Sequence, residues 1–366
     1  MKKTFFFLQF AVLGLLLAAT FFHMINASLK ESAVFDETAH IAAGYSYLKF
    51  LDYRLNPEHP PLLKIISAIP LLFLDLEFPS ASPAWQNEVN GQWEVGRQFL
   101  YESGNDADKI IFWSRTGPIV LTLVLILLVY IWSRELLGGW WALLPTFFLA
   151  FSPTVLAHGH YVTTDIASAL GIAFSLYFFC RFLLKPRMSN LVGAGAAFGA
   201  AQLFKFSAFS LFPLFLFLTF VFYFYTLARD WKETAVLKRI SRFGVRAFRY
   251  LRAVFLIFIS GYAAVYLAYF VFTLNYPLEK QVSDTRSLLA SFPQKEWSGK
   301  AVSLARNRFT RPMAEYLLGL FMAAERSQAG NTAYFWGRLT AQGSPYYFPV
   351  VFSLKESMPS LILIIS

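Results

Sequence analysis

The chain has 366 residues, of which 57% are hydrophobic and 19% aromatic, while only 15% carry a charge. Soluble domains hold about 25% charged residues, so this composition predicts an integral membrane protein, built as an all-α bundle of spanning helices. The formal net charge of +10 does not indicate nucleic-acid binding, because the basic residues lie between apolar segments, where membrane topology accounts for them. The single cysteine, Cys180, excludes an internal disulfide framework and any cysteine-based zinc site.

Apolar segments long enough to span a bilayer recur along the chain. Seven spans are expected, at 5–27, 110–132, 139–157, 166–184, 190–205, 207–227 and 253–274. The fifth and sixth are nearly continuous, which predicts a tight hairpin at Lys205. An eighth apolar run begins near Pro359, and because the chain stops inside it we expect a longer natural protein with a C-terminal remainder.

Membrane topology follows from the positions of the basic residues. With the amino terminus in the cytoplasm, every inner loop carries lysine or arginine, most of all the basic loop 228–252. Segments 29–109 and 275–346 of the single transmembrane domain 1–366 then lie outside. The first of them holds twelve acidic and six basic residues. We expect interfacial amphipathic helices in it, over 62–78 and around 85–101.

The first outer segment opens with Asp36, Glu37 and His40. These residues share one face if 35–51 is helical, because positions three and four apart are neighbours on a helix. A carboxylate beside an imidazole or a second carboxylate can take a proton from an acceptor hydroxyl. The alternative is an acidic helix start, which the helix dipole favours.

A second polar run, Glu58-His59-Pro60-Pro61, follows in the same segment. Each proline restricts the residue before it to extended conformations, so the direction of the His59 imidazole is fixed. Together with the acidic pair and His40, this run raises the alternative of a divalent metal bound by imidazole and carboxylate. Because no recognised ligand spacing is present, we expect neither a metal nor another required cofactor.

Three further residues are candidates for the same site. Asp165 opens the fourth span on the outer side, either as a charge at a helix start or as a second carboxylate facing the site. Lys205 either extends to the interface or holds a phosphate. Arg338 lies among aromatic residues that form either an interfacial belt or a surface that stacks on a sugar while the arginine meets phosphate.

The pattern Asp-Glu-x-x-His-x-x-x-Gly-Tyr-x-Tyr-Leu from Asp36 to Leu48, followed by Glu-His-Pro-Pro-Leu-x-Lys from Glu58, resembles family 39 glycosyltransferases of the GT-C superfamily. This family includes protein O-mannosyltransferases and bacterial aminoarabinose transferases. The resemblance extends in order through His158–Asp165, Phe204–Ser207, Tyr334–Gly337 and Tyr347–Lys355. The outer segment 275–346 is too short for the large soluble domain of the eukaryotic enzymes, which favours the bacterial type.

The resemblance implies an enzyme that moves a sugar from a polyprenyl-phosphate donor to an acceptor hydroxyl, with inversion. Asp36 would be the base, Lys205 would contact the phosphate, and Glu37, Glu58, His59 and Asp165 would shape the acceptor and sugar sites. The expected partners are the lipid-linked donor, a protein or lipid glycan acceptor, and the bilayer. The expected location is the bacterial cytoplasmic (inner) membrane, with the active site facing the periplasm.

The alternative from another class is a transporter or flippase of polyprenyl lipids, because carboxylates at a membrane surface can couple protons to substrate movement. A transporter is expected to hold ionisable residues near the membrane midplane, at broken helices in paired halves. Here the candidates cluster outside the spans and no internal repeat is visible. The sequence therefore favours the enzyme.

Overall fold

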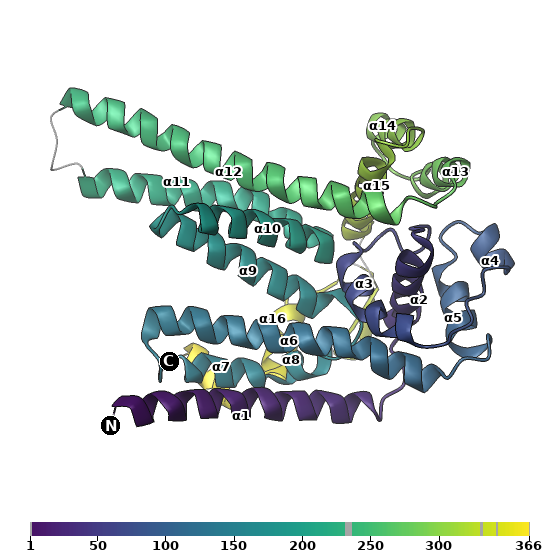
Figure 1. Cartoon of the computed structure of the whole chain (residues 1–366), viewed down its shortest axis with the longest axis horizontal. Helices are drawn as coiled ribbons and strands as arrows, with labels where there is room; N and C mark the ends of the chain where they lie inside the picture. The colour runs from purple at the N-terminus through teal and green to yellow at the C-terminus, as the bar shows by residue number, and fades with distance from the viewer. Residues whose placement is uncertain (1, 231–235, 330–331, 342, 366) are drawn as a thin grey trace.

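The computed structural model describes residues 2–230, 236–329, 332–341 and 343–365. Six long helices run side by side along the molecule (Figure 1): α1 (Lys2–Ser28), α6 (Ala107–Leu137), α9 (Thr164–Leu184), α10 (Met188–Phe204), α11 (Leu211–Asp230) and α12 (Val236–Phe272). The described strands are β1 (Ala333–Phe335) and β2 (Arg338–Thr340), an antiparallel pair. The predicted all-α class is confirmed.

Five helical segments in the described residues are long and apolar enough to cross a membrane: Phe7–Ser28, Ala107–Leu137, Thr164–Leu184, Phe206–Arg229 and Phe243–Phe272. They confirm a multi-pass membrane protein. Each corresponds to one predicted span, and the 17-residue α10 occupies the predicted span 190–205. The tight hairpin at Lys205 is confirmed, because α10 ends at Phe204 and the short 3-10 helix η2 (Phe206–Ser210) leads into α11.

The predicted span at 139–157 is not one helix, which corrects the count of seven. It consists of α7 (Leu143–Ala150) and α8 (Pro153–His158). The break has a local cause: Ser152 accepts a hydrogen bond from the Val155 N–H (3.4 Å), and Pro153 begins the second helix. A serine cap followed by proline starts a new helix, a signal that hydropathy alone does not register.

Much of the predicted inner loop 228–252 is helical, because α12 already begins at Val236. Residues 231–235 of that loop lie outside the described residues. The core of the bundle is an aromatic cluster between α9, α10, α11 and α12, in which the Phe179 and Phe215 rings stack with centroids 4.0 Å apart. Close contact of α10 with α12 requires glycine, since a Cβ on Gly199 would lie 2.8 Å from the Gly261 carbonyl oxygen.

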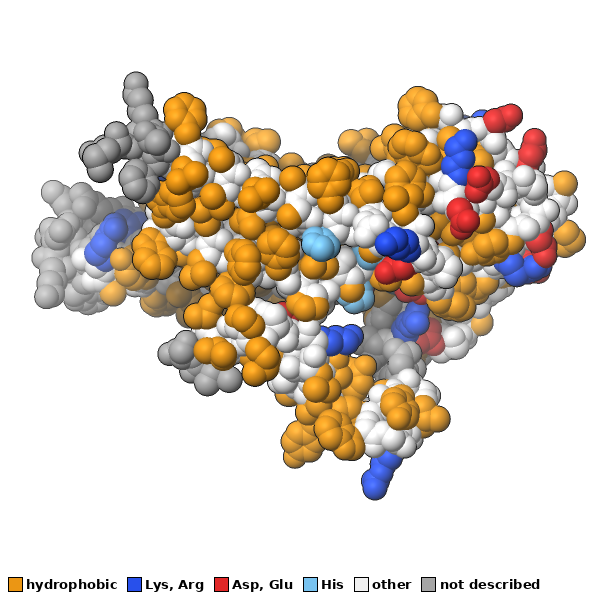
Figure 2. Space-filling view, turned by 90° about the horizontal axis from the view of Figure 1, so that it is seen from below, with side chains coloured by type: hydrophobic (Ala, Val, Ile, Leu, Met, Phe, Trp, Pro, Cys, Tyr) orange, Lys and Arg blue, Asp and Glu red, His pale blue; other side chains and the backbone are white. Residues whose placement is uncertain are grey.

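The predicted first outer segment forms one end of the molecule (Figure 1), here called the polar end. Its elements are α2 (Phe35–Phe50), α3 (Leu62–Ala68), η1 (Ile69–Phe73), α4 (Pro83–Gln86) and α5 (Gln92–Tyr101). Helices are thus present in both stretches predicted to be amphipathic, although the second begins only at Gln92. Figure 2 shows acidic and basic side chains gathered at this end, while hydrophobic side chains cover much of the remaining face.

The second large segment forms α13 (Leu278–Leu288), α14 (Lys295–Ala305) and α15 (Arg311–Ala329), which lie near this end (Figure 1), and the β1–β2 hairpin. Arg311 anchors it, because its guanidinium donates to the carbonyls of Tyr276 (2.9 Å) and Leu274 (2.9 Å) beyond the end of α12. The chain continues through α16 (Tyr347–Lys355) and α17 (Met358–Ile365).

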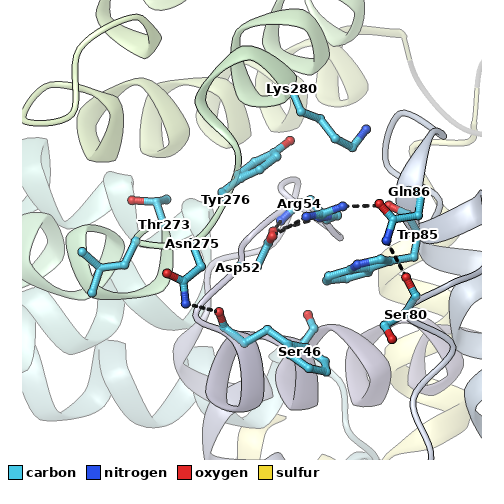
Figure 3. Close-up of polar contacts among 12 residues, drawn as sticks. Ser46, Asp52, Arg54, Ser80, Trp85, Gln86, Thr273, Asn275, Tyr276 and Lys280 are labelled. Carbon is cyan, nitrogen blue, oxygen red and sulfur yellow. Dashed lines mark hydrogen bonds and ion pairs between the residues drawn. The ribbon is translucent and has the colours of Figure 1, made fainter.

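A buried polar network joins these two segments (Figure 3). Arg54 pairs with Asp52 (2.5 Å), donates to the Trp85 carbonyl (2.9 Å) and lies 4.1 Å from the centre of the Trp85 ring. Asn275, beyond the end of α12, donates to the Phe50 carbonyl (2.8 Å) at the end of α2. A buried charge is tolerated where its donors and acceptors are satisfied. The Arg54 contacts hold the first segment together, and the link to the residues after α12 is the Asn275–Phe50 hydrogen bond with the Arg54 guanidinium 5.8 Å from the centre of the Tyr276 ring.

Candidate active site

The first turn of α2 separates the two acidic side chains predicted for the site. Val34 is the cap residue, and its N–H donates to Glu37 Oε2 (2.9 Å), so Glu37 satisfies a free helix-start donor. Asp36 has its side chain exposed at the surface of the polar end. The acidic-start interpretation therefore applies to Glu37, while Asp36 stays accessible for chemistry.

Glu37 forms a completely buried ion pair with Arg115 of α6, a partner that the sequence analysis did not identify. The Arg115 Nε donates to Oε1 (2.9 Å) and Nη2 to Oε2 (2.7 Å). Glu37 Oε1 also accepts from the Val162 N–H (2.9 Å). With all its acceptor sites engaged, Glu37 positions the start of α2 and has no free lone pair directed at a substrate.

Arg115 in turn donates to three backbone carbonyls of the α1–α2 connection. They belong to Ser28 (3.2 Å), Glu31 (2.8 Å) and Ser32 (2.8 Å). The Glu37–Arg115 pair thus joins the end of α1, the start of α2, α6 and the loop before α9. It determines where Asp36 stands.

His40 and His59 pack edge to face, with ring centroids 5.1 Å apart. The His40 Nδ1 lies 2.7 Å from the Val162 carbonyl oxygen, so this nitrogen carries the proton and donates. Burial, together with the charge of Lys64, lowers the pKa of His40 to about 4, and burial, together with His40 and Lys64, lowers the pKa of His59 to about 2. Both rings are neutral at physiological pH.

The Glu58-His59-Pro60-Pro61 run is a loop held from both sides. From α3, the buried Lys64 donates to the carbonyls of Asn56 (2.9 Å) and His59 (2.8 Å). From α5, Gln92 Nε2 donates to Glu58 Oε1 (2.5 Å). Burial holds the pKa of Lys64 well below its usual range. The hydrogen bonds of Lys64 thus hold this loop in place.

Asp165 and Lys205 form an ion pair between the starts of α9 and η2. The Lys205 Nζ lies 2.7 Å from Asp165 Oδ1, and His158 Nδ1 lies 3.8 Å from Oδ2. Lys205 is extended (φ −158°, ψ 139°) where α10 ends. The pair brings together two of the predicted site residues that are 40 positions apart.

The charges of Asp165 and Lys205 both act on the pKa of the Asp36 carboxyl. Partial burial raises the pKa of Asp36, and the carboxylates of Asp165 and Glu58 raise it further, while the cations of Arg326 and Lys205 oppose the rise. No hydrogen bond or ion pair joins Asp36 to His40 within the described part of the chain. Asp36 is thus an accessible carboxylate with a raised pKa, within electrostatic range of two basic side chains.

A cavity of about 380 Å³ opens next to these residues. Glu58, His59 and Lys205 supply its polar wall, and its apolar wall consists of side chains from η2 and α15: Phe206, Phe209, Leu320 and Ala323. Asp36 and Asp165 are not among the lining residues. The cavity joins a cation to an apolar surface, the two features that a lipid phosphate requires.

Arg338 lies on the exposed β1–β2 hairpin. In the described residues its guanidinium makes no hydrogen bond or ion pair with the other predicted site residues. No three histidine, cysteine, aspartate or glutamate side chains in that part of the chain are grouped in a way that would hold a metal ion.

Two residues near the site were not predicted from the sequence, and only the first of them has a sequence signal. Arg115 lies inside the predicted span 110–132, which is otherwise apolar. A charge inside a span requires a partner, and that requirement is the sequence signal for Arg115. Arg326 lies in the last turn of α15, and its proximity to Asp36 depends on the folding of α15 against η2. The sequence gives no indication of that contact.

Residues 107–241 match the family model of the dolichyl-phosphate-mannose-protein mannosyltransferases. Over these residues the chain is similar to that mannosyltransferase family. The match confirms the predicted resemblance to family 39 glycosyltransferases and supports a membrane glycosyltransferase that uses a polyprenyl-phosphate sugar. Neither the comparison with curated proteins nor that with solved structures gives a match.

The segment similar to the mannosyltransferases includes Arg115, Asp165 and Lys205. It begins after the Asp36–Leu48 and Glu58–Lys64 motifs, which carried the resemblance in the sequence. These first two motifs lie outside the family match, whereas His158–Asp165 and Phe204–Ser207 lie within it, and the Glu37–Arg115 pair connects the first motif to the matched part.

Proposed function

We propose that this protein transfers a sugar, with inversion, from a polyprenyl-phosphate donor to an acceptor hydroxyl at the outer surface of a bacterial cytoplasmic membrane. The observation that carries the proposal is Asp36, an accessible carboxylate that lies within electrostatic range of Asp165 and Lys205, of which Lys205 lines the cavity. Asp36 accepts the acceptor's hydroxyl proton, the oxygen forms a bond to the anomeric carbon, and the bond to the lipid phosphate oxygen breaks.

The cavity supports the donor assignment. Lys205 at its edge neutralises charge on the departing phosphate, and the aromatic wall from η2 accommodates the first isoprene units. A lipid phosphate is a good leaving group, so one base and nearby cations suffice. The neutral His40 and His59 rings add hydrogen-bonding capacity without adding charge.

The donor requirement tests this proposal. The purified chain in lipid vesicles is expected to consume a radiolabelled polyprenyl-phosphate sugar when a serine- and threonine-containing peptide is supplied as acceptor probe, and to ignore the nucleotide-linked form of the same sugar. Nuclear magnetic resonance of the product then reports the anomeric configuration, which is inverted. Movement of the intact lipid across the bilayer without sugar transfer would contradict the enzyme and support the transporter alternative.

Arg326 allows the proposed base to be tested by pH. A base acts when deprotonated, so kcat/KM rises with pH through the pKa of Asp36. The Arg326 cation lowers that pKa. The substitution Arg326→Gln is therefore expected to move the acid limb of the kcat/KM profile to higher pH, whereas Arg326→Lys, which keeps the charge, leaves it near its original position. An unmoved limb in Arg326→Gln would show that Arg326 does not act on the base.

A further inference from the structure

A second cavity, of about 490 Å³, lies between α13 and α14, on side chains that contribute nothing to the candidate active site. Three basic side chains line it: Arg286 from α13, and Lys295 and Arg306 from the start and end of α14. Ser298 and Ser303 add hydroxyl groups, and none of the lining residues is acidic. The composition of the cavity is that of an anion site.

The positive charge in this cavity is not compensated by neighbouring acids. Arg286 and Arg306 make no side-chain hydrogen bond or ion pair with any described residue. The nearby acids are engaged elsewhere: Glu296 pairs with Lys300 (2.6 Å), and Asp284 pairs with Lys280 (3.0 Å). Two guanidinium groups from different helices therefore face one cavity with their donors free, which is the arrangement that binds phosphate oxygens.

The turn that follows α14 contacts the end of a candidate span. The Tyr266 hydroxyl of α12 donates to the Phe309 carbonyl (2.8 Å), which places the turn after α14 beside the last turns of the candidate span Phe243–Phe272. Two aromatic side chains near the cavity are exposed, Trp297 at 54% and Phe309 at 69%. Exposed aromatic residues at the end of a span are typical of the headgroup region. Lipid phosphates occupy that region.

We propose that the cavity between α13 and α14 is a phosphate-binding site, separate from the site of sugar transfer, that holds a phosphate group of an anionic lipid headgroup. Arg286 and Arg306 bind the phosphate oxygens from two sides, and Ser303 supplies a further donor. Binding at this site fixes the α13–α15 segment against the membrane surface, and α15 supplies the apolar wall of the cavity at Lys205.

Lipid binding by the full chain in a neutral detergent tests the proposal. The three probes are phosphatidylglycerol, phosphatidylcholine and inorganic phosphate. Native mass spectrometry counts the bound molecules of each probe. The double variant Arg286→Gln/Arg306→Gln is expected to lose about tenfold or more in affinity for phosphatidylglycerol. The charge-matched comparison sets the single variant Arg306→Gln against Arg308→Gln, which removes one positive charge from the same turn outside the cavity lining and is expected to keep its affinity.

The outcomes separate the possibilities. Loss of phosphatidylglycerol binding in the cavity variant, but not in the control variant, confirms the site and a lipid as the source of the phosphate. Binding of inorganic phosphate alone, lost in the same variant, confirms the phosphate site with a soluble source. Equal loss in both variants, which indicates general surface charge, or full retention in the cavity variant would overturn the proposal. Sugar transfer in neutral detergent is expected to be unchanged in the cavity variant, so failure here leaves the proposed enzymatic function intact.

Discussion

Replacing Asp36 with asparagine is expected to reduce kcat/KM for sugar transfer by about 10²–10⁴-fold, the usual contribution of a positioned general base. The substitution keeps the size and shape of the side chain and removes its capacity to take the acceptor proton. Because Asp36 is exposed and forms no ion pair in the described structure, the variant is expected to fold normally. Transfer from a polyprenyl-phosphate sugar by the purified variant measures the effect.

The matched control is Asp75→Asn, which removes an exposed carboxylate from the same polar end. This variant is expected to retain the activity of the parent chain, because Asp75 lines neither the cavity at Lys205 nor the Asp165 pair. Undiminished turnover in Asp36→Asn would remove Asp36 as the base. Equal losses in both variants would point to the overall charge of the surface instead.

The largest loss of stability is expected from breaking the Glu37–Arg115 pair. Arg115→Met leaves the Glu37 carboxylate buried without its cation, and removing one partner of a buried ion pair typically costs about 3–5 kcal/mol. The three carbonyls of Ser28, Glu31 and Ser32 also lose their donor. Denaturant unfolding in detergent micelles measures the change in the free energy of unfolding.

A double-mutant cycle with Glu37→Met separates the ion pair from the other losses. The double variant is expected to be less destabilised than the sum of the two single variants, because it leaves no unpaired buried charge. Arg97→Gln is the control: Arg97 pairs with Glu94 (2.7 Å) on the surface, where solvent screens the charges, so stability is expected to change little. Strict additivity in the cycle would contradict the coupling.

The pair also explains why the two acids at the start of α2 differ in role. Adjacent helical residues point in different directions, so only one of them can face α6. Glu37 faces Arg115 and serves the structure, whereas Asp36 is exposed and stays available. The sequence assigned both acids to the site because it could not distinguish the two directions without knowing where α6 lies.

Several features were readable from the residues alone. Low charge content and long apolar segments determined the all-α membrane class, because a bilayer requires continuous apolar helices of about 20 residues. The turn at Lys205 was predictable from the combined length of the fifth and sixth apolar segments, which exceeds the thickness of a bilayer. The helices of the first outer segment followed from their interrupted apolar pattern. These properties are local, and they depend on composition and spacing over one or two helices.

The candidate site depended on contacts that no local pattern encodes. Lys205 meets Asp165 because α9 and α10 pack along their whole length, and Arg326 comes near Asp36 because α15 folds back against η2. The helix break at Ser152 and Pro153 has a local cause, but the apolar character of the stretch predicted one continuous span. Sequence therefore determined the membrane class and the candidate chemistry, since these follow from residue types. Tertiary structure decided which charges meet, because ion pairs form between helices whose relative positions are set by packing across the entire bundle.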